Sequence, residues 1–275
     1  MFEKYQFNYI LSGNPHKPLI IFLHGFMGNT NEFDEIISII AEDFYCLKID
    51  LPGHGKTQVF GSDEYYQMPN TAKALIKLLD ELLKKLNLDQ CFLIGYSMGG
   101  RLALYLALNF PQYFTKVILE SASPGLATEP ERLGRMKRDA QIARKLSRTT
   151  NPEDFTLFLT NWYSQEIFGD IKTHTQFSEL IKQRLQNDPK QLVKSLKMMG
   201  TGVQPSLWSK LETNNVPLLL LVGELDPKFV EINTKIQQKA KYSQLEIVRD
   251  TAHNIHFAKS LEFVSVVKNF FVTKS

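Results

Sequence analysis

The sequence predicts an α/β protein with a mostly parallel central sheet, helices on both faces of the sheet, and an inserted helical cap. Short apolar segments typical of strands alternate with segments typical of helices along most of the 275 residues. Some strand-like runs, such as 218–222, are apolar at every position, as expected of parallel strands buried on both faces. Residues 124–215 break the alternation, because they contain helical patterns and no convincing strand.

The order of the expected elements follows from this alternation. We expect strands over 4–11, 19–23, 44–49, 90–95, 115–120, 216–222 and 244–249. Helical patterns lie near 31–41, 70–87, 98–109, 227–240 and 260–272. Because the strand pattern resumes at Val216, we expect a core domain of residues 1–123 and 216–275 and a helical cap of residues 124–215.

Composition excludes several classes of protein. The net charge of +3 is too small to indicate a nucleic-acid partner. Within 124–215, however, fourteen Lys and Arg face ten Asp and Glu, so the expected cap carries +4 and suits an acidic ligand. No apolar stretch reaches the ~18 residues that span a bilayer, and the first residues lack a signal-peptide pattern. Cys46 and Cys91 lie in apolar runs, so we expect buried thiols in a cytoplasmic, monomeric protein.

The most informative motif is Gly95-Tyr96-Ser97-Met98-Gly99. It follows the apolar run 91–94 and precedes a helical pattern, so it has the strand–turn–helix context of a nucleophile elbow. In such a turn the serine hydroxyl is lifted from the end of a strand, and the following helix N-terminus favours negative charge. We therefore expect Ser97 to be the catalytic nucleophile or part of the catalytic base.

A serine hydroxyl needs a histidine to accept its proton and a carboxylate to orient that histidine. Downstream of Ser97, Asp226 follows the apolar run 216–222, and His253 follows the last expected strand. This order predicts a triad of Ser97, Asp226 and His253. Glu224 remains a second candidate for the acid, and His256 remains a second candidate for the base.

The motif His24-Gly25-Phe26 follows the expected strand 19–23. A turn at this place presents a backbone N–H to the site, so we expect the N–H groups of Phe26 and Met98 to form an oxyanion hole. His24 is then expected to be structural. Apart from His253 and His256, no pair of His or Cys residues has the close spacing of metal ligands, and that pair lacks further ligands, so we expect neither a metal nor another cofactor.

Several longer strings resemble those of the α/β-hydrolase superfamily and, within it, the 2-succinyl-6-hydroxy-2,4-cyclohexadiene-1-carboxylate synthase family, known as MenH. They are FLHGFMG at 22–28, DLPGHG at 50–55, GYSMGGR at 95–101, SASPGL at 121–126, GTGVQPSLW at 200–208, GELDPKF at 223–229 and HNIH at 253–256. The resemblance covers nearly the whole chain. It implies an α/β-hydrolase fold and a lyase of menaquinone or phylloquinone biosynthesis.

This resemblance implies a carbon–oxygen lyase rather than a hydrolase. The implied substrate is 2-succinyl-5-enolpyruvyl-6-hydroxy-3-cyclohexene-1-carboxylate, a tricarboxylate from which pyruvate is eliminated. The Ser97–His253 pair would remove a proton next to the succinyl ketone, and the oxyanion hole would hold the resulting enolate.

The resemblance also implies residues that bind the carboxylates, for which arginine is well suited because its planar fork binds a carboxylate with two hydrogen bonds. Arg101 matches a substrate-binding arginine, and Arg135 matches a cap arginine, with Arg132 and Arg138 as open alternatives. The remaining matches are Arg184, Tyr96, Trp162 and Tyr163.

Two other functions fit the same residues. A hydrolase of a carbon–carbon or ester bond in an acidic substrate would use the same triad. A receptor-like binding module would keep the fold without needing Ser97 for its response to a ligand.

Overall fold

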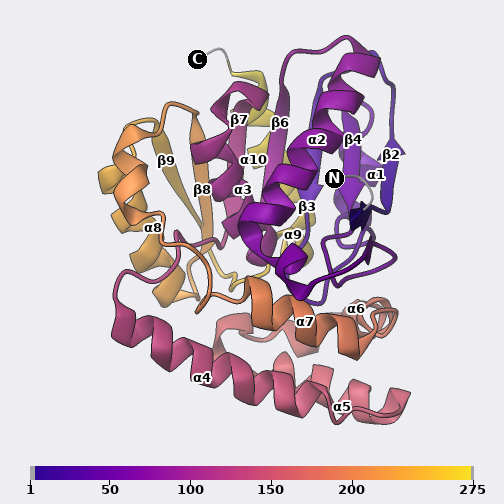
Figure 1. Ribbon diagram of the computed structural model, residues 1–275. Helices are drawn as coiled ribbons and strands as arrows, with labels where there is room; N and C mark the ends of the chain where they lie inside the picture. Colours follow the sequence, from indigo (N-terminus) through magenta and orange to yellow (C-terminus); the bar gives the residue numbers. More distant parts are fainter. Residues whose placement is uncertain (1–3, 274–275) are drawn as a thin grey trace.

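The computed structural model describes residues 4–273, and it has the α/β-hydrolase architecture that the sequence predicts (Figure 1). A seven-stranded sheet has the order β2-β4-β3-β6-β7-β8-β9. Its strands are β2 (Tyr9–Ser12), β3 (Leu19–Leu23), β4 (Tyr45–Ile49), β6 (Cys91–Tyr96), β7 (Phe114–Glu120), β8 (Leu218–Gly223) and β9 (Ser243–Val248). All neighbouring pairs are parallel except β2 with β4.

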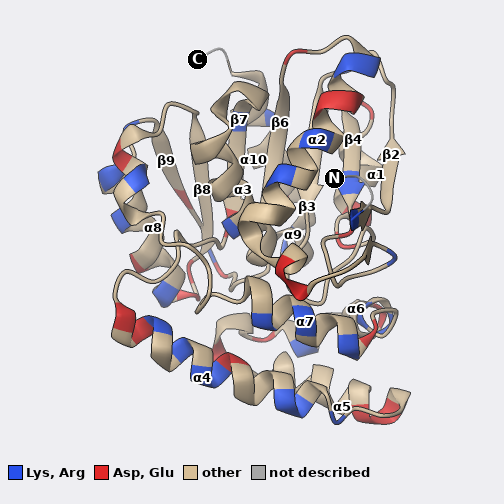
Figure 2. Ribbon diagram, in the orientation of Figure 1, with Lys and Arg blue, Asp and Glu red and all other residues tan. Residues whose placement is uncertain are grey.

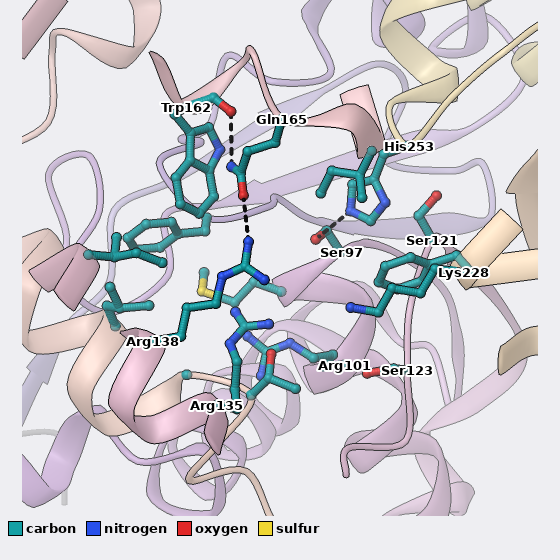
Figure 3. A pocket seen from close by; sticks show the side chains of 18 of the residues that line it. Ser97, Arg101, Ser121, Ser123, Arg135, Arg138, Trp162, Gln165, Lys228 and His253 are labelled. Carbon is teal, nitrogen blue, oxygen red and sulfur yellow. Dashed lines mark hydrogen bonds between the residues drawn. The ribbon is translucent and has the colours of Figure 1, made fainter. Parts of the chain in front are cut away.

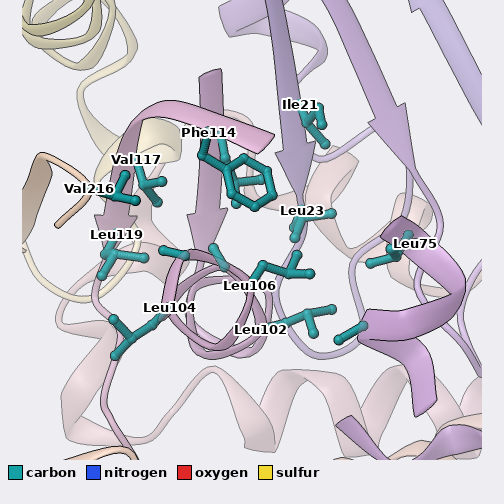
Figure 4. Close-up of a cluster of buried hydrophobic side chains, with 14 of the residues drawn as sticks. Ile21, Leu23, Leu75, Leu102, Leu104, Leu106, Phe114, Val117, Leu119 and Val216 are labelled. Atoms are coloured by element: carbon teal, nitrogen blue, oxygen red, sulfur yellow. The ribbon is translucent and has the colours of Figure 1, made fainter. Parts of the chain in front are cut away.

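Helices cover both faces of this sheet. On one face, α2 (Met68–Leu86), α3 (Met98–Asn109) and α8 (Pro227–Lys239) pack against apolar strand residues, as Figure 4 shows for Leu102 and Leu106. On the other face lie α1 (Asp34–Ile40), the short α9 (Ile255–Ala258) and α10 (Ser260–Val272). Parallel strands buried on both faces need apolar residues at every position, and β3 and β8 are buried along their whole length.

The first expected strand, 4–11, is wrong in one respect, because it forms two strands in different sheets. β1 (Tyr5–Gln6) pairs with β5 (Gln58–Val59), whereas β2 joins the main sheet. Asn8 lies at the break, where its N–H donates to Thr57 Oγ1 at 2.9 Å and its side chain donates to Asp50 at 2.7 Å. These bonds turn the chain from one sheet to the other.

Between β7 and β8 the chain forms cap-like helices without a strand, as expected for 124–215. They lie along one end of the sheet, below it in Figure 1. Their bounds are α4 (Glu129–Leu146), α5 (Pro152–Trp162), α6 (Phe177–Arg184) and α7 (Pro189–Met199). The domain limits at 123/124 and 215/216 stay a prediction. Shorter 3₁₀ turns are η2 (Asp63–Tyr66), η3 (Pro111–Tyr113), η4 (Glu166–Phe168), η5 (Ile171–Thr173) and η6 (Trp208–Thr213).

The cap helices share a cluster of buried apolar side chains. Side-chain hydrogen bonds at their N-termini fix where three of these helices begin. Thr128 caps α4 through a capping box with Glu131, and Asn151 and Asp188 accept N–H groups at the starts of α5 and α7. Figure 2 shows Lys and Arg distributed along α4 and α7. Within residues 4–273, no helix is both long enough and apolar enough to cross a membrane.

Candidate active site

The nucleophile elbow forms where β6 meets α3. Ser97 has a φ of 49°, and its N–H donates to the carbonyl of Glu120 on the neighbouring strand at 2.8 Å. A Cβ at Gly99 would fall on the carbonyl of Leu23, and one at Gly95 would fall on the backbone of Gly99. The two glycines therefore allow the strand and helix to approach closely enough to hold Ser97 in this strained conformation.

The structure brings Ser97, Asp226 and His253 together. His253 Nε2 lies 3.0 Å from Ser97 Oγ, and His253 Nδ1 lies 2.7 Å from Asp226 Oδ2. Asp226 and His253 are 1% and 3% exposed, so water does not compete for these bonds. Because an ionised carboxylate only accepts hydrogen bonds, a neutral His253 carries its proton on Nδ1 and leaves Nε2 to accept the Ser97 proton.

The two alternatives from the sequence lie in other positions. Glu224 is exposed, and its side chain accepts the N–H of Asp250 at 3.1 Å. His256 is buried and its Nδ1 lies 2.7 Å from Glu120 Oε2, so it does not face Ser97 through that nitrogen. The geometry therefore favours Asp226 and His253 over Glu224 and His256.

The proposed oxyanion residues flank the nucleophile. Met98 is the first residue of α3, where a backbone N–H has no acceptor within its own helix. Phe26 and Met98 both line the same cavity as Ser97. His24 has a structural role, because its Nε2 accepts the N–H of Leu51 at 2.9 Å while its Nδ1 lies 2.7 Å from the Gly25 carbonyl. Burial lowers the pKa of His24, which fits a neutral ring with these two bonds.

A cavity of about 510 Å³ lies between the sheet end and the cap, with Ser97 and His253 in its wall (Figure 3). The cap contributes apolar and aromatic groups to it, among them Trp162, Phe168 and Leu196. The ring of Trp162 meets that of Phe26 edge-on, with 5.6 Å between centroids. The volume of the cavity falls within the usual range of small-molecule binding sites.

Among the described residues, four Lys and Arg side chains line this cavity: Arg101, Arg135, Arg138 and Lys228. In Figure 3 the guanidinium groups of Arg101 and Arg135 lie close together, and the ammonium group of Lys228 points into the same space. Arg101 is held from the cap, because its Nη1 donates to the Met199 carbonyl at 2.9 Å and to Gln204 Oε1 at 2.8 Å. Burial, with a further contribution from Arg135, lowers the pKa of Arg101 to about 9, so it stays charged at neutral pH.

The cap arginines differ in what they contact. Arg135 Nε pairs with Asp139 Oδ1 at 2.7 Å, and Arg138 Nη2 lies 3.4 Å from Gln165 Oε1. Arg132 instead donates toward the Gly202 carbonyl at 3.4 Å, and it is not among the described residues that line the cavity. The geometry therefore favours Arg135 and Arg138 over Arg132.

Sequence reasoning did not single out Lys228, which lines the cavity, although its string GELDPKF was one of those that carried the resemblance. It follows Asp226 by two residues, in the first turn of α8. Burial lowers the pKa of Lys228, and Arg135 and Arg138 lower it further. Mutual repulsion of these cations would be relieved by an anion bound among them.

Three predicted substrate-binding residues lie outside the cavity wall of the described chain. Arg184 is 1% exposed, pairs with Glu32 and donates through Nε to the Tyr163 hydroxyl at 2.9 Å. Tyr163 is 3% exposed, and Tyr96 packs beneath His253 with 5.6 Å between ring centroids. These three side chains lie behind the described cavity wall, and their part in substrate binding stays a prediction.

Within residues 4–273, no group of three or more His, Cys, Asp or Glu side chains is placed to hold a metal ion. Cys46 and Cys91 are both buried free thiols, and burial raises the pKa of each.

Comparison with known proteins confirms the fold and identifies relatives within it. Residues 18–260 match the family model described as the alpha/beta hydrolase fold. The chain is 32% identical to the 2-succinyl-6-hydroxy-2,4-cyclohexadiene-1-carboxylate synthase of Enterobacter sp. (strain 638), over 89% of this chain and 88% of that protein. It is 34% identical to a Bacillus subtilis (strain 168) protein provisionally given the same name, over 91% and 89%.

A solved structure gives the same result. The structure of MenH from S. aureus superimposes with a TM-score of 0.84 and 32% identity, covering 98% of this chain and 97% of that one. Sequence and structure thus agree over nearly the full length of both proteins. The chain belongs to the MenH family, the 2-succinyl-6-hydroxy-2,4-cyclohexadiene-1-carboxylate synthases, within the α/β-hydrolase superfamily.

Proposed function

We propose that this protein is a 2-succinyl-6-hydroxy-2,4-cyclohexadiene-1-carboxylate synthase, a carbon–oxygen lyase of menaquinone or phylloquinone biosynthesis. Its substrate would be 2-succinyl-5-enolpyruvyl-6-hydroxy-3-cyclohexene-1-carboxylate. The observation that carries the proposal is a hydrogen-bonded Ser97–His253–Asp226 set in the wall of a cavity lined by four basic side chains. A tricarboxylate would pair with these cations, which outnumber the one carboxylate of the described lining, Glu166.

The reaction begins at the carbon next to the succinyl ketone. The Ser97–His253 pair removes the proton on ring carbon 2, and His253 holds that proton as an imidazolium paired with Asp226. The electron pair passes to the ketone oxygen, where the N–H groups of Phe26 and Met98 stabilise the enolate.

The enolate then collapses and completes the elimination. A double bond forms between ring carbons 2 and 3, the original double bond moves to carbons 4 and 5, and the bond from carbon 5 to the ether oxygen breaks. Pyruvate leaves as its enolate and takes up a proton, so no water, oxidant or covalent enzyme intermediate is needed.

The basic residues bind the charged groups of the substrate. Arg101 and Lys228 approach from the core, whereas Arg135 and Arg138 approach from the cap. Trp162 and Phe26 offer an apolar wall for the cyclohexene ring. We expect the ligand to orient its ketone toward Met98 because its carboxylates are held on the opposite, basic side.

The test is a pyruvate assay coupled to lactate dehydrogenase, run on the enolpyruvyl cyclohexene tricarboxylate. Wild-type protein should release pyruvate while the absorbance of the conjugated diene appears, and Ser97→Ala should release it at least about 10³-fold more slowly. Ser38→Ala is the matched control, because Ser38 is exposed and its hydroxyl donates to the carbonyl of Glu35. It should behave as wild type.

Other results of these measurements would indicate a hydrolase or a binding module instead. No pyruvate release, together with Ser97-dependent hydrolysis of an aryl ester or a carbon–carbon bond in an acidic substrate, would establish a hydrolase. Ligand binding without turnover in both wild type and Ser97→Ala would indicate a binding module. We further propose that the protein acts as a cytoplasmic monomer without a cofactor, which cell fractionation and light scattering would check.

A further inference from the structure

A row of four buried charged side chains lies behind the triad and extends from the cap to the sheet. Arg184 in α6 pairs with Glu32, which lies between β3 and α1. Glu32 Oε1 lies 3.7 Å from His256 Nε2, and His256 Nδ1 lies 2.7 Å from Glu120 Oε2. All four side chains are at most 2% exposed, so water screens their charges little and the opposite charges stabilise one another.

The two carboxylates around His256 favour a doubly protonated ring. His256 Nδ1 is hydrogen-bonded to Glu120, whereas Nε2 lies 3.7 Å from Glu32, beyond hydrogen-bond distance, and has no hydrogen-bond partner among the described residues. Each ring nitrogen faces a carboxylate, and a neutral imidazole would direct a lone pair at one of them. The other groups packed on the ring are aromatic: Phe33, Tyr96 and Phe263. With His256 as a cation, these four side chains carry two positive and two negative charges, so the group as a whole is neutral.

The carboxylates of Glu120 and Glu32 raise the pKa of His256. Burial alone would lower the pKa of His256, but Glu120 and Glu32 outweigh burial and raise it to about 9. Burial would likewise raise the pKa of Glu32, yet Arg184 and His256 hold it below its usual range. Tyr96 faces the same ring and stays neutral, because burial raises its pKa well above the usual range.

Each carboxylate also holds one part of the catalytic machinery. Glu32 Oε2 accepts the N–H of Gly25, the residue before Phe26, at 3.2 Å. Glu120 Oε1 accepts the N–H groups of Ile255 and His256, at 2.7 and 3.0 Å, just after His253. The backbone carbonyl of Glu120 accepts the N–H of Ser97. The oxyanion turn, the histidine loop and the nucleophile elbow are therefore tied to the same two residues.

We propose that Arg184, Glu32, His256 and Glu120 form a charge-balanced positioning device, in which His256 as an imidazolium holds the 253–256 loop so that His253 stays aligned with Ser97. Arg184 and His256 are then positioning residues, and neither contacts the substrate. Arg184 also extends the device into the cap, where it holds the hydroxyl of Tyr163. The kinetic consequence rests on the proposed lyase function, whereas the protonation of His256 does not.

The first experiment reads that protonation directly in the wild-type protein. Protein labelled with ¹⁵N-histidine is studied by NMR at pH 7.5, and His256→Gln identifies the His256 signals. We expect two protonated ring nitrogens on His256 and a single proton, on Nδ1, for His253. A neutral His256 ring in folded wild type would overturn the proposal, whatever reaction the enzyme catalyses.

The second experiment breaks the charge balance with Glu32→Gln. We expect kcat for pyruvate release to fall at least tenfold with KM within twofold of wild type, and the downfield Nδ1 proton of His253 to broaden or disappear. Glu42→Gln is the matched control, because Glu42 is exposed, and it should change none of these readouts.

The two experiments separate the possible failures. Should Glu32→Gln not fold, the wild-type NMR result still decides the protonation of His256. If folded Glu32→Gln keeps both its kcat and the His253 proton signal, the positioning role is wrong. If wild-type protein releases no pyruvate, the lyase function fails, and the His253 signal in Glu32→Gln alone judges the positioning role.

Discussion

Replacement of Arg101 by alanine is the sharpest test of the binding site. In the described chain, Nη1 is the atom of this guanidinium that bonds protein groups, namely the carbonyl of Met199 and the side chain of Gln204. The side chain lines the cavity near Ser97, so its remaining N–H groups are available to a carboxylate of the ligand. Arg101→Ala removes a positioned cation while the triad stays untouched.

The expected magnitude follows from these contacts. Loss of a charge-assisted hydrogen bond to a carboxylate costs about 1.5–3 kcal/mol, which corresponds to about 10- to 150-fold in kcat/KM. Truncation also leaves the Met199 carbonyl and Gln204 Oε1 without a donor, and unpaired buried groups cost about 1–3 kcal/mol each in stability. The variant should therefore have a lower Tm as well as a lower kcat/KM.

The coupled pyruvate assay measures the first effect and thermal unfolding measures the second. Arg101→Lys keeps the charge and loses the planar fork, so it should recover only part of the activity. Trp162→Ala is the comparator, because it removes an apolar wall without a charge, and Arg101→Ala should lose at least as much activity. A kcat/KM equal to wild type in Arg101→Ala would show that the basic side of the cavity does not bind substrate.

Three further outcomes are expected. Asp226→Asn should lower kcat about 10³- to 10⁴-fold with little change in KM, and a loss under tenfold would contradict the triad. Lys228→Met should raise KM about tenfold without lowering Tm, and an unchanged KM would show that it binds no carboxylate. The pKa of His256 rises from ~6.5 when unfolded to about 9 when folded, so its stabilisation is fully present below pH 6.5 and is lost as pH rises through 9. Urea unfolding should show a loss on the order of 3 kcal/mol over this window, and a decline as steep in His256→Gln would refute the assignment.

The fold and the position of Ser97 could be predicted because their signals are local. The alternation of apolar runs and helical patterns gives the sheet, and the carboxyl ends of parallel strands meet at one edge. Ser97, Asp226 and His253 each follow a strand, so sequence order alone placed them at the same edge.

The role of Arg184 could not be predicted in the same way. An arginine in a helical pattern looks the same whether its partner is solvent, a ligand or a buried carboxylate. Its partner Glu32 lies 152 residues away in the sequence, and nothing local connects the two. The resemblance supplied a matching arginine but not the direction of its side chain.

Lys228 and the N-terminal strand show the same limit. Lys228 lies in the first turn of α8, and its direction into the cavity depends on how that helix packs against β8. The break at Asn8 depends on bonds to Asp50 and Thr57, which come from distant turns. The periodicity of apolar residues identifies helices and strands, but it does not predict the side-chain contacts between them.

The place of the cap in the chain has an evolutionary consequence. The chain leaves the sheet after Glu120 and returns at Leu218, on two strands that are direct neighbours, with Val117 paired to Leu218. A segment whose two ends join neighbouring strands of one sheet can be lengthened, shortened or exchanged without changing the order of the strands. Selection could thus change the shape of the cavity by changing the cap. Ser97, Asp226 and His253 would keep their geometry, because all three lie outside that segment.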